Sequence, residues 1–311
     1  MDLDSAKPIK IEDKYLFDNY FKRYSPEISE FTFTNLFMWR NYYQFLFIEY
    51  KNHLIIFSND YLKTRRKPIL REDPRNFRYF FPPIGPHADQ IIIDLFENLE
   101  NLEVHRLSDR ICKDLVQNEK YINLNLKCIE DRNNWDYIYD KNEIINLEGN
   151  KYRQNRRWLH KFLGNYNYDF QLLTEDLIEK CKELQLEWCI LRGCTEDESL
   201  EAEQEAIYEA LNNFSDLGFS GGILCVDDKC AAYTFGEMLN DNTLVIHIEK
   251  AHIKYEGAYQ AINNFFLKNC CINALFVNRE QDLGIDGIKR AKESYKPIRM
   301  VRKSIIYRKP V

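Results

Sequence analysis

Thr243–Lys250 reads TLVIHIEK, and Ala274–Glu280 reads ALFVNRE. Both are short runs rich in β-branched and aromatic residues, which is typical of strands. Gly257–Lys268 lies between them and is predicted to be a helix. A strand, a helix and a second strand in this order form a right-handed crossover, so the two strands should pair in parallel. This segment therefore predicts an α/β fold built around a parallel pair of strands.

The elements around this crossover occur in a similar order in both halves of the chain. In the second half, a hairpin precedes it, and a helix and a final strand follow it, over Gly222–Gly236, Ile285–Lys296 and Ile298–Tyr307. The first half is predicted to begin with two helices, over Ile11–Tyr24 and Phe31–Tyr43. A hairpin over Phe45–Phe57 follows, and then a strand, a helix and a strand over Asn76–Phe81, His87–Glu100 and Glu103–Leu107. A last helix is predicted to begin near Ser108. The shared order predicts a structural duplication, with one domain over 1–148 and another over 149–311.

The composition is that of a globular protein. The 311 residues are 45% hydrophobic and 30% charged, enough for two domains of about 150 residues each. The net charge of −6 argues against a protein that coats nucleic acid through its overall field. No apolar run of membrane-spanning length and no apolar signal core occurs, so we expect a cytoplasmic protein without a transmembrane segment. The nine cysteines lack zinc-site spacing, so we expect reduced thiols and no metal.

Polar side chains gather at the ends of the two predicted parallel strands. If side chains alternate strictly, one face of the first strand carries Thr243, Val245, His247 and Glu249. In the second strand, Asn278 and Glu280 likewise share a face. Open α/β sheets bind ligands at the carboxyl ends of their parallel strands. The sequence therefore predicts a ligand site here.

The same residues have a simpler interpretation. Glu249 could pair with Lys250, and Glu280 with Arg279, as ordinary ion pairs at strand ends. The functional interpretation predicts instead that these side chains, together with Asn278, line one pocket. Only the three-dimensional arrangement can distinguish the two.

The last predicted helix carries lysines at positions 289, 292 and 296, which places them on one face. Such a face could be solvated, or it could hold the phosphate of a lipid headgroup or of a nucleotide 3′ end. Tyr295 flanks Lys292 and could donate a proton, or it could belong to the core. Asp282 could be the N-cap of this helix or a catalytic group.

The loop after the first parallel strand bears on the cofactor. A pyrophosphate is held by backbone N–H groups of a glycine-rich turn at a helix N-terminus. Lys254–Tyr259 reads KYEGAY, which has the single glycine Gly257, and Glu256 places a carboxylate where a phosphate would bind. The sequence predicts weak or no binding of acyl-CoA.

The second half resembles the C-terminal domain of bacterial phosphatidylglycerol lysyltransferases, and more closely stand-alone bacterial proteins that share that domain, and the likeness to these proteins extends upstream over nearly the whole chain. The stretches that carry the resemblance are VIHIEKA, GAYQAIN, VNREQDLG, GIKRAKESYKP, SEFTFTNLFMW and KYRQNRRWLHKF, at Val245–Ala251, Gly257–Asn263, Val277–Gly284, Gly287–Pro297, Ser29–Trp39 and Lys151–Phe162. The resemblance implies two tandem GNAT-like units, each a mixed sheet flanked by helices, similar to the Fem-type peptidyltransferases. This sequence departs from the lysyltransferases in having no membrane-spanning flippase domain.

The resemblance also implies a reaction, the transfer of an aminoacyl group from a charged tRNA to an amine or hydroxyl acceptor, such as a small molecule or a lipid headgroup. A basic segment between the halves could contact tRNA phosphates or form a charged inter-domain helix, through Lys151, Arg153, Arg156 and Arg157. Two other functions stay open, a CoA-dependent N-acetyltransferase and a non-catalytic ligand-binding protein. Fold does not decide among them.

We assign candidate roles within the predicted site as follows. Glu249 or Glu280 would orient an aminoacyl ammonium group, Asn278 would position the substrate, and Lys250 and Arg279 would counter negative charge. The predicted catalytic residues are Glu249, Asn278, Glu280 and Tyr295. The predicted substrate-binding residues are His247, Lys250, Arg279, Asp282 and Lys292.

Overall fold

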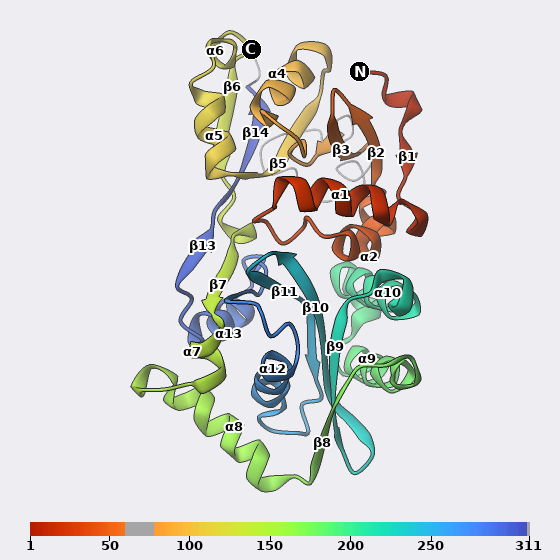
Figure 1. The fold of residues 1–311 in the computed structure, drawn as a ribbon, viewed down its shortest axis with the longest axis vertical. Helices are drawn as coiled ribbons and strands as arrows, with labels where there is room; N and C mark the ends of the chain where they lie inside the picture. Colours follow the sequence, from red (N-terminus) through yellow and green to blue (C-terminus); the bar gives the residue numbers. More distant parts are fainter. Residues whose placement is uncertain (60–77, 310–311) are drawn as a thin grey trace. The chain divides into compact units, whose positions relative to one another are not determined.

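The computed structural model describes residues 1–59 and 78–309. The contacts within the chain divide it into two compact units, one of Met1–Trp135 with Val301–Val311 and one of Asp136–Met300 (Figure 1). The first residues of the strand predicted from Asn76 lie outside the described residues.

The first unit is built on a seven-stranded mixed sheet in the order β1-β2-β3-β4-β5-β14-β6. Among the described strands of this sheet, β4 and β5 pair in parallel, and the other neighbours are antiparallel. The strands are Lys7–Pro8, Leu46–Tyr50, His53–Ser58, Arg78–Phe80, Leu102–Ser108, Lys303–Arg308 and Leu126–Glu130 in that sheet order. The helices α1, α2, α4, α5 and α6 span Lys14–Tyr24, Phe33–Tyr43, Ala88–Asn98, Asp109–Val116 and Glu119–Asn123.

The second unit has a sheet of the same size in the order β13-β7-β12-β11-β10-β9-β8. These strands are Arg299–Val301, Asp136–Asp140, Phe276–Asn278, Thr243–Ala251, Lys229–Asn240, Ser220–Val226 and Tyr168–Leu172. The parallel pair is β11 with β12, as predicted. The helices α7 to α13 span Lys141–Asn146, Arg153–Asn165, Ile178–Arg192, Glu198–Asn212, Phe214–Leu217, Ala258–Asn269 and Asp286–Ser294.

Each sheet contains one strand supplied by the other half of the chain. β7 follows β6 in sequence but lies between β12 and β13, and β14 at the C-terminus lies between β5 and β6. The predicted final strand Ile298–Tyr307 is therefore two strands in two sheets. The units consequently divide after Trp135 and at Val301, whereas the sequence suggested one boundary near 148. Local sequence patterns do not reveal strand partners this far apart in the chain.

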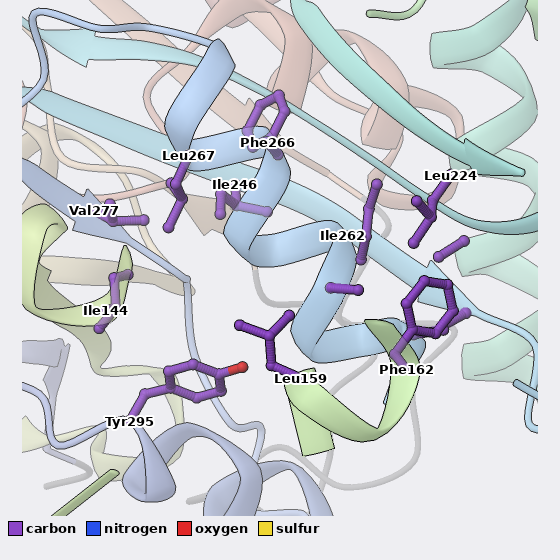
Figure 2. Packing of buried hydrophobic residues seen from close by; sticks show 14 of the residues in the cluster. Ile144, Leu159, Phe162, Leu224, Ile246, Ile262, Phe266, Leu267, Val277 and Tyr295 are labelled. Atoms are coloured by element: carbon purple, nitrogen blue, oxygen red, sulfur yellow. The ribbon is translucent and has the colours of Figure 1, made fainter. Parts of the chain in front are cut away.

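The core of the second unit forms where α12 covers the sheet. Ile262 and Phe266 of α12 pack with Ile246 of β11 and Val277 of β12, as Figure 2 shows. Phe162 of α8 completes this cluster and is fully buried. α12 packs on the sheet because its apolar residues recur with the helical period and so form one apolar face.

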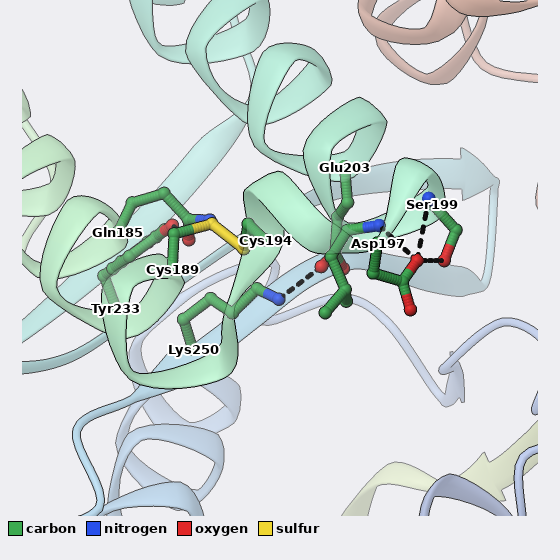
Figure 3. Close-up of a disulfide and its surroundings, with 9 residues drawn as sticks. Gln185, Cys189, Cys194, Asp197, Ser199, Glu203, Tyr233 and Lys250 are labelled. Atoms are coloured by element: carbon green, nitrogen blue, oxygen red, sulfur yellow. Dashed lines mark hydrogen bonds and ion pairs between the residues drawn. A yellow bond between two sulfur atoms is a disulfide. The ribbon is translucent and has the colours of Figure 1, made fainter.

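Two pairs of cysteines are disulfide-bonded, Cys112 with Cys128 and Cys189 with Cys194, which corrects the expectation that all nine are reduced. Gly193 ends α9 in the left-handed conformation, with φ of 67°, and the chain turns back there. This turn brings Cys194 to a Cα distance of 5.0 Å from Cys189, as seen in Figure 3. Among the described residues, no group of three or more His, Cys, Asp or Glu side chains is placed to hold a metal.

Candidate functional site

A β-bulge in β11 shapes the centre of the second unit. Phe235 of β10 pairs with Ile248, and the next residue, Gly236, pairs with Ile246. His247 is therefore the additional residue of the bulge. A Cβ atom at Gly236 would lie 2.1 Å from the carbonyl oxygen of Val245, so only glycine fits opposite the bulge.

The bulge changes which side chains share a face. Beyond it, Glu249 lies on the side of α12, where its Oε2 accepts a hydrogen bond of 3.0 Å from Asn263 Nδ2. His247 instead contacts Glu237 and Glu280. The prediction that His247 and Glu249 share a face is therefore wrong, because strict alternation does not continue through a bulge.

Lys250 does not join the other candidate residues. Its Nζ pairs with Glu203 of α10 at 2.6 Å (Figure 3). The same Nζ lies 3.6 Å from the ring centroid of Trp188 in α9. Lys250 follows Glu249 directly in an extended strand, so the two side chains point to opposite faces. This placement does not support the prediction that Lys250 lines one pocket with Glu249 and counters negative charge there.

His247 bridges two carboxylates. Its Nδ1 lies 3.0 Å from Glu280 Oε1, and its Nε2 lies 3.0 Å from Glu237 Oε1. The histidine side chain is 1% exposed, whereas those of Glu237 and Glu280 are 19% and 18% exposed. Burial alone would lower the pKa of His247, but the hydrogen bonds and charges of the two carboxylates outweigh it and raise the pKa to about 9. At neutral pH an imidazolium therefore holds two partly exposed carboxylates in place.

These residues lie where β11 and β12 separate. The two strands pair only over Thr243–Val245 and Phe276–Asn278, whereas β11 continues to Ala251. Just after β12, Glu280 adopts the left-handed conformation with φ of 56°, and its N–H donates to Asn278 Oδ1 at 2.8 Å. Asn278 is itself fixed by Asp136 at 3.1 Å. Asn278 thus positions the backbone that presents Glu280.

Lys292 reaches this site from α13. Its Nζ donates to the carbonyl oxygen of Gln281 at 2.5 Å and also to that of Arg279. Burial lowers the pKa of Lys292 to about 8, although the negative charge of Glu280 partly opposes the shift. The ammonium group therefore lies close to the end of β12 and loses its proton more readily than an exposed lysine.

Asp282 accepts hydrogen bonds that stabilise the same turn. Its Oδ2 accepts from the Tyr137 hydroxyl at 2.5 Å, and its Oδ1 accepts from the N–H of Gly284 at 2.8 Å. The residue at the N-cap of α13 is Ile285, so the interpretation of Asp282 as that cap is wrong. Asp282 instead shapes the turn between Glu280 and the helix.

A second cluster forms on the side of α12. Arg279 Nη2 lies 2.8 Å from Glu249 Oε1, and its guanidinium lies 4.8 Å from the ring centroid of Tyr295. Tyr295 belongs to the buried core cluster, and burial raises the pKa of its hydroxyl. Both oxygens of Glu249 are engaged, by Arg279 and by Asn263. This geometry fits a structural ion pair, but the partners differ from the pairs expected from the sequence, Glu249 with Lys250 and Glu280 with Arg279.

The structure therefore separates the predicted residues into groups. One contains His247, Asn278, Glu280, Asp282 and Lys292, and the other contains Glu249, Arg279 and Tyr295. Sequence reasoning missed Glu237 and Asp136. A charged residue beside Gly236 in the otherwise apolar run AAYTFGEML was a signal for Glu237. We find no comparable signal for Asp136.

The basic segment is partly used in local structure. Lys151 pairs with Glu143 at 2.6 Å, and Arg156 Nη1 donates to the carbonyl oxygens of Leu147 and Gly149. Arg153 and Arg157 are exposed on α8. Of the four basic residues predicted to contact phosphates, Arg153 and Arg157 are therefore the two that are exposed and have no ion-pair or hydrogen-bond partner among the described residues.

The pKa values predict how stability depends on pH. The pKa of His247 is raised from 6.5 to about 9. The stability that this histidine contributes to the folded state is therefore fully present below pH 6.5 and is lost as the pH rises toward 9. The pKa of Lys292 is lowered from 10.5 to about 8, so this lysine has the opposite effect: it makes the free energy of unfolding rise with pH, mainly above pH 8. Between pH 6.5 and 8 we expect the free energy of unfolding to fall by about 1.5 kcal/mol because of His247. Urea titrations of the wild type and of His247→Gln across this range check it, since the variant should lack this fall.

Two mixed sheets, each with a parallel pair at its centre and helices on its faces, define a tandem GNAT-like protein. The chain belongs to the family described as phosphatidylglycerol lysyltransferase, C-terminal, which it matches over residues 21–307. Within the described part of the chain, no helix has both the length and the apolar character needed to cross a bilayer.

Two solved structures and one further protein sequence are similar to this chain. A conserved protein of unknown function from Bacteroides thetaiotaomicron is 29% identical, with a TM-score of 0.85 over 98% of this chain and 99% of that one. L-PGS from Bacillus licheniformis has the same fold at 12% identity, with a TM-score of 0.63 over 96% of this chain and 93% of that one. An uncharacterised protein of Mycoplasmoides gallisepticum is 24% identical over 73% of this chain and 74% of its own length.

Proposed function

We propose that this protein transfers an aminoacyl group from a charged tRNA to an amine or hydroxyl acceptor, with the reaction centred on Glu280. One observation carries the proposal: a buried imidazolium, His247, holds the carboxylates of Glu237 and Glu280 at the point where the parallel strands separate. Membership of the lysyltransferase C-terminal family supports the class of reaction.

Aminoacyl transfer requires removal of a proton from the acceptor. The acceptor nitrogen or oxygen attacks the ester carbonyl carbon, the carbonyl–O bond to the tRNA ribose breaks, and the ribose oxygen takes up a proton. Glu280 is the proposed base, because burial raises the pKa of its carboxyl and so makes it a better proton acceptor. His247 orients this carboxylate through the 3.0 Å hydrogen bond.

The site also supplies charge for the other steps. Lys292 lies next to the end of β12 and would stabilise the oxyanion that forms on the ester carbonyl. Glu237, held by the same imidazolium, would attract the ammonium group of an aminoacyl substrate. Arg153 and Arg157 on α8 would add salt-dependent contacts to tRNA phosphates.

An acyl-CoA donor is less compatible with the helix that follows β11. Gly257 at the N-cap of α12 has φ of 86°, and a Cβ atom there would lie 2.2 Å from the carbonyl oxygen of Trp158 in α8. Lys161 of α8 also pairs with Glu256. The helix start that would hold a pyrophosphate therefore lies against α8.

We expect acetyl-CoA to bind weakly or not at all, because α8 and the carboxylate of Glu256 occupy the surroundings of this helix start. Isothermal titration calorimetry with acetyl-CoA and with CoA provides the measurement. A dissociation constant of about 1 µM, or about −8 kcal/mol, would contradict this expectation and favour the N-acetyltransferase alternative.

The reaction itself is tested with total tRNA charged with labelled amino acids. The protein is incubated with this donor and a panel of amines, hydroxyl compounds and lipids, and labelled product is separated from tRNA. Transfer from tRNA to one acceptor class supports the proposal. Thermal stabilisation by a ligand without any transfer would favour the non-catalytic binding protein instead.

A further inference from the structure

One threonine hydroxyl contacts the backbone of β11 at its bulge. Thr234 of β10 donates from Oγ1 to the carbonyl oxygen of Ile248 at 2.7 Å, and the threonine is fully buried. Ile248 directly follows His247, the additional residue of the bulge. A bulge interrupts the ladder of hydrogen bonds between two strands. The hydroxyl therefore supplies a donor at the point where the regular pairing of β10 with β11 is broken.

Thr234 lies on the face of the sheet that α12 covers. It pairs with Glu249 in the register of β10 and β11, and residues directly opposite one another in an antiparallel pair share a face. The side chain of Glu249 contacts α12. Glu237 follows Thr234 by three residues, so alternation places it on the opposite face, where it meets His247. The threonine therefore lies behind the candidate site and is not placed to touch a ligand there.

The bulge needs both space and an attachment. Gly236 gives the space, because a Cβ atom there would lie 2.1 Å from the carbonyl oxygen of Val245. A missing side chain cannot hold the strand, however, and the hydrogen bond from Thr234 to Ile248 does so. Valine in place of this threonine would have nearly the same shape but no donor. The buried carbonyl oxygen would then lose this partner, which is costly in the interior of a protein.

We propose that Thr234 is a positioning residue of the candidate site, because its hydroxyl holds the bulge in the arrangement in which His247 reaches both Glu237 and Glu280. Each ring nitrogen of the histidine lies 3.0 Å from one carboxylate oxygen. A shift of the bulged backbone by about 1 Å would lengthen at least one of these contacts beyond hydrogen-bond range. This role depends on the geometry of the site and not on the proposed reaction, so either can fail without the other.

An NMR titration of the histidine signals of the full chain tests this role, with the His247 signal assigned from its absence in His247→Gln. In the wild type the two carboxylates raise the pKa of His247 to about 9. In Thr234→Val we expect this pKa to fall by about 1 or more, a tenfold weaker affinity for the proton, because at least one carboxylate contact is lost. Thr234→Ser keeps the hydroxyl and should keep the wild-type pKa.

Thr243→Val is the matched control. Thr243 is also buried and begins the same strand, but its hydroxyl donates to the side-chain oxygen of Asn242 at 3.0 Å, so the pKa of His247 should be unchanged. An equal fall in this control, or a lower melting temperature of Thr234→Val with an unchanged pKa, would overturn the proposal. If Thr234→Val does not fold, Thr234→Ala is titrated instead. Failure of both variants to fold would show that the hydroxyl supports the whole sheet and not the bulge.

Discussion

Glu280→Gln is expected to lower the rate of aminoacyl transfer by about 10²–10⁴-fold, the contribution of a positioned general base. The amide cannot accept the acceptor's proton, but its carbonyl oxygen can still accept a hydrogen bond from His247, which lies 3.0 Å from Glu280 Oε1 in the wild type. The backbone bend at φ of 56° does not depend on the carboxylate either. The loss should therefore be of activity, not of folding.

Two measurements separate catalysis from structure in this variant. The melting temperature should stay close to that of the wild type, and the pKa of His247, followed by NMR, should fall from its value of about 9 because one of its two carboxylates is gone. Glu293→Gln, on the exposed side of α13, is the matched control and should keep full activity. A Glu280→Gln protein that unfolds several degrees early while transferring at the normal rate would make Glu280 a structural ion-pair partner.

Lys303→Met is expected to destabilise the first unit by about 3–5 kcal/mol, the usual result of removing one partner of a buried ion pair. Lys303 Nζ lies 2.6 Å from Glu30 Oε2, and both side chains are buried. Arg106 links the same carboxylate to Asp131, through contacts of 2.7 Å and 2.9 Å. Because Lys303 lies in β14, the network joins the C-terminal strand to a residue near the N-terminus.

Chemical denaturation measures this effect. The pKa of Glu30 is lowered because Lys303 and Arg106 outweigh its burial, so the lysine's removal leaves a poorly compensated buried charge. Glu30→Gln combined with Lys303→Met should recover much of the lost stability, since no unpaired carboxylate remains. Lys127→Met on the exposed side of β6 should have little effect. Equal stability of wild type and Lys303→Met would show that the pair contributes nothing.

The duplicated fold places these two networks at corresponding positions. Leu102 begins β5, which pairs in parallel with β4, and Phe276 begins β12, which pairs in parallel with β11. Arg106 follows Leu102 by four residues, and Glu280 follows Phe276 by four. Both residues have left-handed backbones, with φ of 63° and 56°. In the first unit this bend carries an arginine within a buried ion network, and in the second it carries a glutamate held by histidine. This difference supports placing the reaction in the second unit.

Local patterns in the sequence were sufficient to predict most elements of this chain and the parallel pairing of β11 with β12. Strand and helix periods depend on neighbouring residues, so the hairpin near Lys51 and the helices α2 and α12 lie close to the predicted ranges. Glu280 and its neighbours were found because open α/β sheets bind ligands at the carboxyl ends of parallel strands, and Lys292 was found from the spacing of the lysines on the last helix.

The tertiary structure alone decided how these elements combine. The bulge at His247 depends on Gly236 in the neighbouring strand, so alternation along β11 could not show that His247 and Glu249 point to different faces. The places of β7 and β14 depend on pairing between residues more than a hundred positions apart. Glu237 meets His247 only through that bulge. Side-chain periodicity is a local property, whereas register and strand order are set by contacts distant in sequence, and the candidate site depends on both.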